Sequence, residues 1–522
     1  MKPKTYRRSM RFGKVAAQTI IVGLATVIGG AITVPQMMSS MKSPVAATAT
    51  SESASPELPG AAATPQPALT VTSIAPFEPY IAVKKDSVSF EHRTISDVAK
   101  LESTLAESQP SSINVFFATD RALVRASDLH LWAKTIIPAG LSLAICGILL
   151  LQSLYAQRRR WLWWTAFTAV GLVTCFLIQQ ASVQSAQLYR MASRGSVWFS
   201  SQRYESADTD YPLQLGISEV SLPANRNKGE LPTPSIFKLE FSEQADRHVS
   251  IQRIDRMDPD EFFTGIDAVL AQEKSNSAMV FIHGYNVAFD DAMRRTAQIA
   301  ADVKLQGPPI LYSWPSSGKL LSYSQDESNV AWSVTHLERF LLDLRQRTGI
   351  KKLHLVAHSM GNRALMGALE RIALRLPDKQ PLFAQVVMAA PDVDTDDFLK
   401  RYASSVAACA TRATLYASSG DRALLASMKI HGYRRLGLTS SPQPTVLGID
   451  VIDVSPIDTS LLGHSYYGSH PLMIQELREL IDSGTGPINR QWLMTAQETQ
   501  TPPLWRFRLT ELTAQIPTDL SR

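Results

Sequence analysis

The stretch K-L-H-L-V-A-H-S-M-G-N-R, from Lys352 to Arg363, decides the fold prediction. An apolar run typical of a buried strand ends at Ser359, and a predicted helix follows from Gly361 to about Leu376. A strand that turns sharply into a helix pushes the serine hydroxyl out above the sheet, as in a nucleophile elbow. Ala357 replaces the first glycine of that motif, and a tight turn still accommodates so small a side chain. The structural alternative is a serine that only caps the helix.

The same alternation of apolar runs and amphipathic stretches continues on both sides of this motif. Predicted strands A-M-V-F-I-H and P-I-L-Y-S-W precede helices expected at 288–303 and 329–347, and Q-V-V-M-A-A-P-D, T-L-Y-A-S-S-G-D and V-L-G-I-D-V-I-D-V-S follow. Repeated units of this kind predict an α/β fold, a mostly parallel sheet with helices on both faces. We place the catalytic domain at 196–485, its first strand at 112–121 and a C-terminal tail at 486–522.

Three polar residues follow predicted strands in an order that suits nucleophilic catalysis. Ligands of parallel sheets bind at the carboxyl ends of the strands. Ser359 is followed by Asp421 at the end of a later strand, and then by His464 in L-L-G-H-S-Y-Y-G. In this fold the chain order is serine, acid, histidine. His464 would take the proton from Ser359, while Asp421 would orient the imidazole ring and stabilise its charged form.

The motif H-G-Y-N, at His283–Asn286, follows an earlier strand at the place where this fold builds one wall of an oxyanion hole. We expect the backbone N–H groups of Tyr285 and Met360 to stabilise the charge that grows on a carbonyl oxygen during attack. The His283 side chain is expected to hold the loop.

Other polar residues compete for the same roles. Asp392 or Asp394, in A-P-D-V-D, could be the acid, although they follow a strand that comes one earlier than usual. His470 could replace His464 as the base. His354 and His358 lie within the strand that leads to the serine, and we expect them to be structural.

Three long apolar stretches predict membrane helices at 15–34, 135–155 and 161–178. The last two form a hairpin joined by Arg158, Arg159 and Arg160, with Trp161, Trp163 and Trp164 typical of a membrane interface. The first stretch is a membrane anchor or a cleaved signal peptide. Residues 35–111 are rich in Pro, Ala, Ser and Thr and are expected to form a linker.

Positive charge predicts which way the chain faces. Residues 1–14 hold six lysines and arginines and no acid, so we place them and the triple-arginine turn in the cytoplasm. The C-terminal domain then lies on the extracytoplasmic side, whether or not the first stretch is cleaved. The net charge is +5, so the chain beyond residue 14 carries −1, and no basic nucleic-acid groove is indicated.

The cysteines and the charged residues suggest no cofactor. Cys146, Cys175 and Cys409 stand far apart, which indicates neither a disulfide framework nor a zinc site. We expect no metal and no cofactor.

The motifs V-F-F-A-T-D-R, H-G-Y-N, Y-S-W-P-S, V-A-H-S-M-G-N-R and A-P-D-V-D together resemble a bacterial α/β-hydrolase family, domain of unknown function 900. The resemblance covers about residues 112–121 and 196–485. It implies esterase-like chemistry with Ser359 as nucleophile, Asp421 as acid and His464 as base. The chain departs from the family by inserting the predicted hairpin after Arg121, which would follow an edge strand and hold the domain close to the bilayer.

These observations together predict a membrane-anchored serine hydrolase of the bacterial inner membrane, esterase- or lipase-like, that cleaves a carboxylic ester through an acyl-enzyme. The expected partners are the bilayer and an ester or lipid-like small molecule, with no nucleic acid. An acyltransferase using the same residues, or a non-catalytic envelope protein on a hydrolase scaffold, are the alternatives. The segment from about 213 to 264 shows few periodic signals and is expected to pack beside the sheet or over the site.

Overall fold

The computed structural model describes residues 110–124, 137–155, 160–193, 196–204, 211–235, 240, 242–319, 322–376, 380–439, 443–457, 464, 466–497 and 502–508. The predicted basic N-terminus, the first apolar stretch and all but the last two residues of the predicted linker lie outside these ranges.

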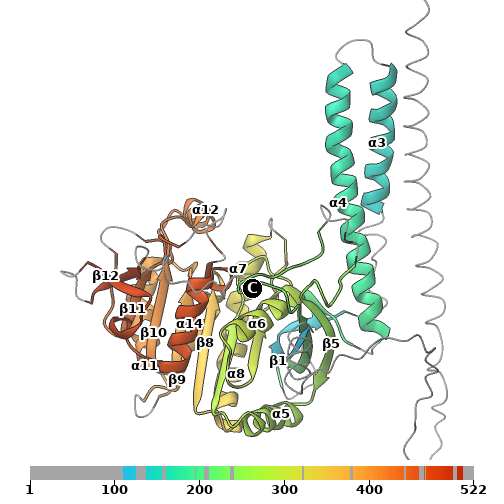
Figure 1. Cartoon of the computed structure of the whole chain (residues 1–522). Helices are drawn as coiled ribbons and strands as arrows, with labels where there is room; N and C mark the ends of the chain where they lie inside the picture. The colour runs from blue at the N-terminus through green and yellow to red at the C-terminus, as the bar shows by residue number, and fades with distance from the viewer. Residues whose placement is uncertain are drawn as a thin grey trace, which may run out of the picture. The chain divides into compact units, whose positions relative to one another are not determined.

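One large sheet organises the domain, in the strand order β12-β13-β11-β10-β9-β8-β6-β7-β1-β4-β5. It runs across Figure 1 from β12 on the left to β5 on the right. Every neighbouring pair from β13 to β1 is parallel, and β12, β4 and β5 add antiparallel pairs at the two sides. The strands are β1 (Ser111–Thr119), β4 (Gln214–Leu222), β5 (Ser250–Met257), β6 (Ser277–Ile282), β7 (Pro309–Ser313), β8 (Lys352–His358), β9 (Phe383–Ala389), β10 (Ala410–Ala417), β11 (Ile449–Asp453), β12 (Leu493–Gln497) and β13 (Leu504–Phe507). The predicted α/β class is confirmed.

Helices cover both faces of this sheet. The main ones are α5 (Pro259–Gln272), α6 (Phe289–Asp302), α7 (Tyr323–Trp332), α8 (Val334–Arg347), α9 (Gly361–Ala373), α11 (Ala403–Cys409), α12 (Arg422–His431) and α14 (Pro471–Ser483); α10 (Thr395–Asp397) and α13 (Tyr466–Ser469) are short. One hydrophobic core joins α5, α8, α9 and α11 to one face, and a second joins α6 and α14 to the other. Adjacent strand residues alternate between the cores: Leu355 belongs to the first and Val356 to the second. Because both faces are buried, the central strands read as continuous apolar runs.

The predicted helix at 329–347 is two helices. Ser333 separates α7 from α8, and its hydroxyl bonds the carbonyl of Asn329 at 3.0 Å. The hydroxyl of Tyr312 donates to the Ser333 carbonyl at 3.2 Å. The same carbonyl also accepts the N–H of Leu337 at 2.9 Å, so the Tyr312 hydroxyl adds a second bond, from the sheet, at the point where α7 meets α8.

Two of our expectations about the ends of the sheet were wrong. β1 is an interior strand, because β4 and β5 add beyond it as antiparallel partners. The weakly periodic segment from 213 thus extends the sheet. The predicted tail at 486–522 contributes β12 and β13, which pair next to β11. Their buried apolar side chains, such as Leu493 and Phe507, complete the second core at this edge.

A helical hairpin interrupts the chain after β2 (Arg121–Leu123), and the chain returns in β3 (Phe199–Arg203). β2 and β3 pair as a separate two-stranded sheet. The hairpin consists of α3 (Ile137–Tyr155) and α4 (Arg160–Ser193), which lie side by side in Figure 1. The hydroxyls of Ser142 and Thr174 bond across them at 2.6 Å.

The hairpin carries an apolar exterior. Within the residues that the structure describes, one helical segment, Trp161–Gln179, is long and apolar enough to cross a membrane, and Gly140–Leu154 is apolar but shorter. Large apolar side chains such as Leu141 and Leu172 are exposed, at 62% and 66%. Three membrane helices are therefore not confirmed. Composition and length single out one candidate span among the described residues, and the predicted first span at 15–34 lies outside the described ranges.

Candidate active site

The turn after β8 holds Ser359 in a strained backbone conformation. Its φ of +51° lies in the left-handed region, which residues with a side chain rarely adopt. Asn362 braces this turn, because its side-chain amide donates to the carbonyls of Ala357 and Ser359 at 3.3 and 3.1 Å. A Cβ at Gly361 would overlap the carbonyl oxygen of His283, so glycine is required where α9 begins. Strain held by such contacts is typical of a nucleophile elbow.

The structure brings Ser359, His464 and Asp421 together in one hydrogen-bonded chain. His464 Nε2 lies 2.8 Å from Ser359 Oγ, and His464 Nδ1 lies 2.7 Å from Asp421 Oδ2. A neutral ring with the proton on Nδ1 donates to the carboxylate and accepts from the serine hydroxyl. The three residues are 43 to 105 positions apart in the chain. This geometry is the one that activates a serine hydroxyl.

Asp421 is held from two sides. Its carboxylate is fully buried, and it is the N-cap of α12, where Oδ1 accepts the N–H of Leu424 at 2.9 Å. Oδ2 remains for His464. Because one carboxylate oxygen caps a helix and the other faces the imidazole, α12 sets the orientation of the acid.

The loop at His283–Asn286 packs directly against the serine turn. A Cβ at Gly284 would lie 2.9 Å from the Cβ of Ser359 and 2.8 Å from Nδ1 of His358. The predicted oxyanion donors, the amides of Tyr285 and Met360, each follow one of the two residues in this contact, Gly284 and Ser359. The loop and the serine turn are therefore in direct contact, and the two amides follow the residues that touch.

A buried arginine fixes this loop from below. Arg121 is 1% exposed and donates from Nη2 to the carbonyl of Val287 at 2.9 Å, from Nη1 to the carbonyl of Ser316 at 2.9 Å and from Nε to Ser313 Oγ at 2.9 Å. Burial lowers the pKa of Arg121 to about 10, although nearby carboxylates oppose this effect. No role for Arg121 was inferred from the sequence. Its position at the end of V-F-F-A-T-D-R, directly before the inserted hairpin, is the one sequence feature that could have pointed to it.

His283 is structural, as we expected. Its ring stacks on Trp314 with centroids 5.0 Å apart, and the indole N–H of Trp314 donates to the His283 carbonyl at 2.7 Å. Burial, and then the positive charge of Arg121, lower the pKa of His283 to about 3. The imidazole therefore stays neutral at ordinary pH.

His358 contacts the segment that carries His464. Its Nε2 lies 2.9 Å from the carbonyl oxygen of His464 and must donate to it, and its ring stacks on Tyr467. Burial, and then the neighbouring His464, keep the pKa of His358 well below its ordinary value. A structural role agrees with our expectation, but the direct contact with His464 was not foreseen.

The competing acid and base candidates have other partners. His470 caps α14, accepting the N–H of Leu472 at 3.2 Å, and Asp394 caps α10 in the same way. His354 lies 3.0 Å from Ser277 Oγ near the start of β8. Asp392 accepts from Ser427 Oγ at 2.6 Å, beside the nucleophile turn. The side-chain hydrogen bonds of Asp392, Asp394 and His354 are thus to groups other than Ser359 and His464.

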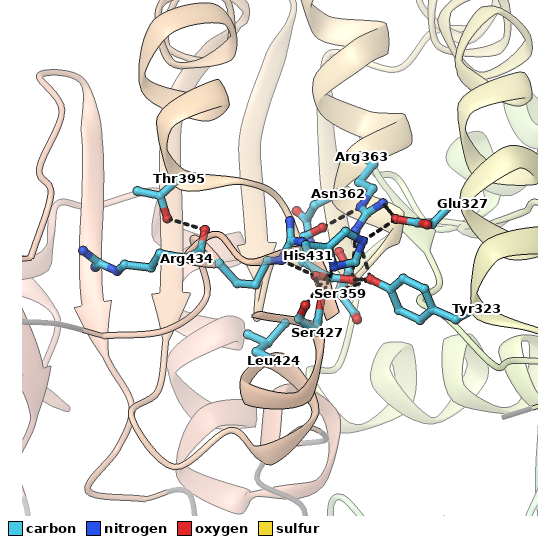
Figure 2. A network of polar contacts seen from close by, with 12 residues as sticks. Tyr323, Glu327, Ser359, Asn362, Arg363, Thr395, Leu424, Ser427, His431 and Arg434 are labelled. Carbon is cyan, nitrogen blue, oxygen red and sulfur yellow. Dashed lines mark hydrogen bonds and ion pairs between the residues drawn. The ribbon is translucent and has the colours of Figure 1, made fainter. Parts of the chain in front are cut away.

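A charged cluster lies beside Ser359. Figure 2 shows the side chains of Tyr323, Glu327, Arg363 and His431 converging near Ser359. Arg363 Nη1 and His431 Nε2 lie 2.6 and 2.7 Å from the same oxygen of Glu327. Glu327 thereby connects its helix, α7, both to α12 and to the first turn of α9. Nothing in the sequence beyond the presence of charged residues indicated this cluster.

The described part of the chain contains no group of three or more His, Cys, Asp or Glu side chains that could hold a metal ion. Cys409 is buried, and burial raises the pKa of its thiol to about 12.

Comparison with known proteins finds a family model that matches part of the chain. Residues 258–482 match the family model described as alpha/beta hydrolase of unknown function (DUF900), so the resemblance inferred from the sequence is confirmed over that segment. An uncharacterized protein of Nostoc sp. is 25% identical over 134 residues. That alignment covers 21% of this chain and spans about a third, 35%, of the relative. The family match and the sheet together show an α/β-hydrolase-like fold and suggest a hydrolase function.

Proposed function

We propose that the protein is a serine hydrolase that cleaves a carboxylic ester through an acyl-enzyme, with Ser359 as nucleophile, His464 as general base and Asp421 as the orienting acid. The observation that carries this proposal is the hydrogen-bonded chain from Ser359 Oγ through His464 to Asp421, with distances of 2.8 and 2.7 Å. A serine forced to positive φ at the end of a central strand supports the same role.

In the acylation step, Ser359 Oγ attacks the carbonyl carbon of the ester while its proton moves to Nε2 of His464. The carbonyl electron pair becomes an oxyanion, which the amides of Tyr285 and Met360 stabilise. When this intermediate collapses, the bond to the leaving oxygen breaks and the departing alcohol takes the proton from Nε2. The acyl group stays on Ser359.

Deacylation repeats these steps with water. His464 Nε2 takes one proton from the water as its oxygen attacks the acyl carbon, and Ser359 leaves with that proton. One ester and one water give one acid and one alcohol. Asp421 keeps its charge throughout, and that charge stabilises the imidazolium that forms twice in each cycle.

Labelling with a fluorophosphonate tests the proposal. Wild-type protein is expected to form a covalent adduct at Ser359, and Ser359→Ala is expected to form none. Ser277→Ala serves as the control. Ser277 lies at the start of β6, beside His354, and so at the opposite end of the parallel strands from Ser359. An unlabelled wild type, or equal labelling of Ser359→Ala, would contradict the enzyme proposal.

The protein is anchored in the bacterial inner membrane, with the catalytic domain on the extracytoplasmic side. The apolar segment Trp161–Gln179 and the exposed apolar side chains of the hairpin support anchoring. The basic residues at 1–14 and 158–160 support the orientation. The protein should remain in the membrane after alkaline carbonate extraction. A C-terminal phosphatase reporter that requires export should be active, whereas an inactive one would reverse the topology.

A domain tethered at a bilayer meets lipid-linked substrates at high local concentration, so lipid or lipid-linked esters are the proposed substrate class. A profile of activity against ester chain length tests this class: a preference for long acyl chains supports it, and exclusive cleavage of short, water-soluble esters contradicts it. Addition of an acceptor alcohol to the same assay separates hydrolysis from acyl transfer.

A further inference from the structure

Asp392 lies next to the turn that holds Ser359, but its partners differ from those of Asp421, the acid of the proposed mechanism. The backbone N–H of Asp392 donates to the carbonyl of Ser359 at 3.2 Å. Arg363, in the first turn of the helix after the serine, donates from Nε to the Asp392 carbonyl at 2.6 Å. The main chain at Asp392 is therefore joined to the nucleophile turn from two directions.

The carboxylate of Asp392 reaches α12. Its Oδ1 accepts the hydroxyl of Ser427 at 2.6 Å, and Ser427 lies in the middle of α12. Because Asp421 is the N-cap of that helix, a bond to Ser427 restrains the acid relative to the serine turn. The far end of α12 is tied as well, since His431 bonds Glu327 at 2.7 Å.

The second carboxylate oxygen reaches α7 and, through it, the oxyanion loop. Oδ2 of Asp392 accepts the hydroxyl of Tyr323, which also lies 3.1 Å from Ser427 Oγ. The Tyr323 ring meets the ring of Tyr285 edge to face, with centroids 5.0 Å apart. The buried Asp392 is thus linked to the serine turn, to α12 and, through Tyr323, to the oxyanion loop.

A charged group is needed at this position. Asp392 is 2% exposed, and the guanidinium groups of Arg363 and Arg435 lie 3.2 and 3.5 Å from its oxygens. Burial alone would raise the pKa of Asp392, but the charge of Arg363 and the hydroxyls of Ser427 and Tyr323 outweigh it and lower the pKa below its ordinary value. The carboxylate is therefore ionised and holds its donors by charge-assisted hydrogen bonds.

We propose that Asp392 is a positioning residue of the ester-cleaving site, which fixes the acid-bearing helix α12 and the oxyanion loop relative to Ser359 through its bonds to Ser427 and Tyr323. This inference rests on the proposed function. This role differs from that of the alternative acid considered from the sequence. Asp392 would act on the geometry of the site, whereas an acid partner would act on the charge of His464.

The test compares Asp392→Asn with the wild type in fluorophosphonate labelling and in ester turnover. The variant keeps the shape of the side chain and removes its charge. We expect labelling rate and kcat to fall by about 10- to 100-fold, since small misplacements of reacting groups have effects of this size. KM should change by less than about threefold, and the midpoint of the acid limb of the pH profile should stay at the wild-type value.

Glu476→Gln is the matched control. Glu476 is also a buried carboxylate that accepts from a tyrosine hydroxyl, Tyr416 at 3.0 Å, and pairs with an arginine, Arg490. It lies on α14, and these bonds do not involve the turn at Ser359. The control should lower the melting temperature as Asp392→Asn does and leave labelling rate and kcat near the wild-type values.

The outcomes separate the two proposals. If the wild type is not labelled, the proposed function fails. If the wild type is labelled, three results overturn the role of Asp392: Asp392→Asn within twofold of the wild type in rate, equal rate losses in Asp392→Asn and Glu476→Gln, or a displaced acid limb, which would make Asp392 the partner of the base. Should Asp392→Asn not fold, Ser427→Ala and Tyr323→Phe replace it. Each is expected to lower kcat by about three- to tenfold, and wild-type kcat in both overturns the inference.

Discussion

His354 makes the stability of the domain depend on pH. Its side chain is 2% exposed near the start of β8, where Nε2 lies 3.0 Å from Ser277 Oγ. Burial, and then the charge of Lys352, lower the pKa of His354 from 6.5 to about 4. The folded protein therefore keeps this ring neutral at a pH at which the unfolded chain takes up a proton. The perturbation is acidification, compared between the wild type and His354→Gln.

The sign and size of the effect follow from proton linkage. Between pH 6.5 and pH 4 the unfolded state binds one more proton at His354 than the folded state does, so the free energy of unfolding falls as the pH falls. The slope is about 1.4 kcal/mol per pH unit, which amounts to about 2 kcal/mol between pH 6.5 and pH 5. Above pH 6.5 His354 is neutral in both states, so the protein keeps its full free energy of unfolding. In a domain of this size, about 2 kcal/mol corresponds to about 4 to 8 °C in melting temperature.

Thermal melting of the full chain in detergent, followed from pH 7.5 to pH 5, measures this effect. Over that range the melting temperature of His354→Gln should fall less than that of the wild type, by a difference of about 4 °C or more. The comparison does not depend on the melting temperature of the variant at pH 7.5. Ser277→Ala keeps the imidazole and should follow the wild-type slope. Equal slopes for His354→Gln and the wild type would refute the reasoning, because His354 would then take up its proton in the folded state as readily as in the unfolded one.

Three substitutions at the site have specific expected outcomes. Asp421→Asn should lower kcat by about 10⁴-fold, measured as ester turnover, with KM little changed, since the ring of the base loses its correct tautomer. Gly284→Ala should abolish labelling, because its Cβ would meet the serine turn at 2.9 Å, whereas Gly432→Ala, at φ +78° in open space, should keep wild-type labelling and lose about 1 kcal/mol in a melting experiment. Arg121→Lys should destabilise the protein by about 2 kcal/mol or more, visible as a lower melting temperature, because one ammonium group cannot replace the planar set of donors; unchanged melting would show that the loop does not depend on the guanidinium.

The central sheet could be predicted because each strand is indicated by a pattern within its own short segment of the chain. Strands such as β6 and β8 are buried on both faces, so their residues are apolar without interruption, and each is followed by an amphipathic helix. Ser359, Asp421 and His464 stand directly after such strands, and their order along the chain is a property of the fold. These features need no knowledge of contacts between distant segments.

What could not be predicted depends on contacts between distant segments. β4 mixes polar and apolar residues, and β13 is four residues long, so neither stands out until its partner strand is known. Arg121 acts through Ser313 and Ser316, which are 192 and 195 positions away. The sequence left Asp392 open as an alternative acid, and the two are distinguished by their partners: Asp421 bonds His464, whereas Asp392 bonds Ser427.

The hairpin between β2 and β3 leaves and rejoins the domain at one point. The N–H of Val124 donates to the carbonyl of Trp198 at 2.9 Å, so the residue that leads out and the residue that leads back are hydrogen-bonded neighbours. The register of the two-stranded sheet is then independent of the length and nature of the chain between them. Because these two residues are neighbours, we expect that a turn of a few residues could join them and that a gene could gain or lose the whole segment without changing the sheet that carries Ser359.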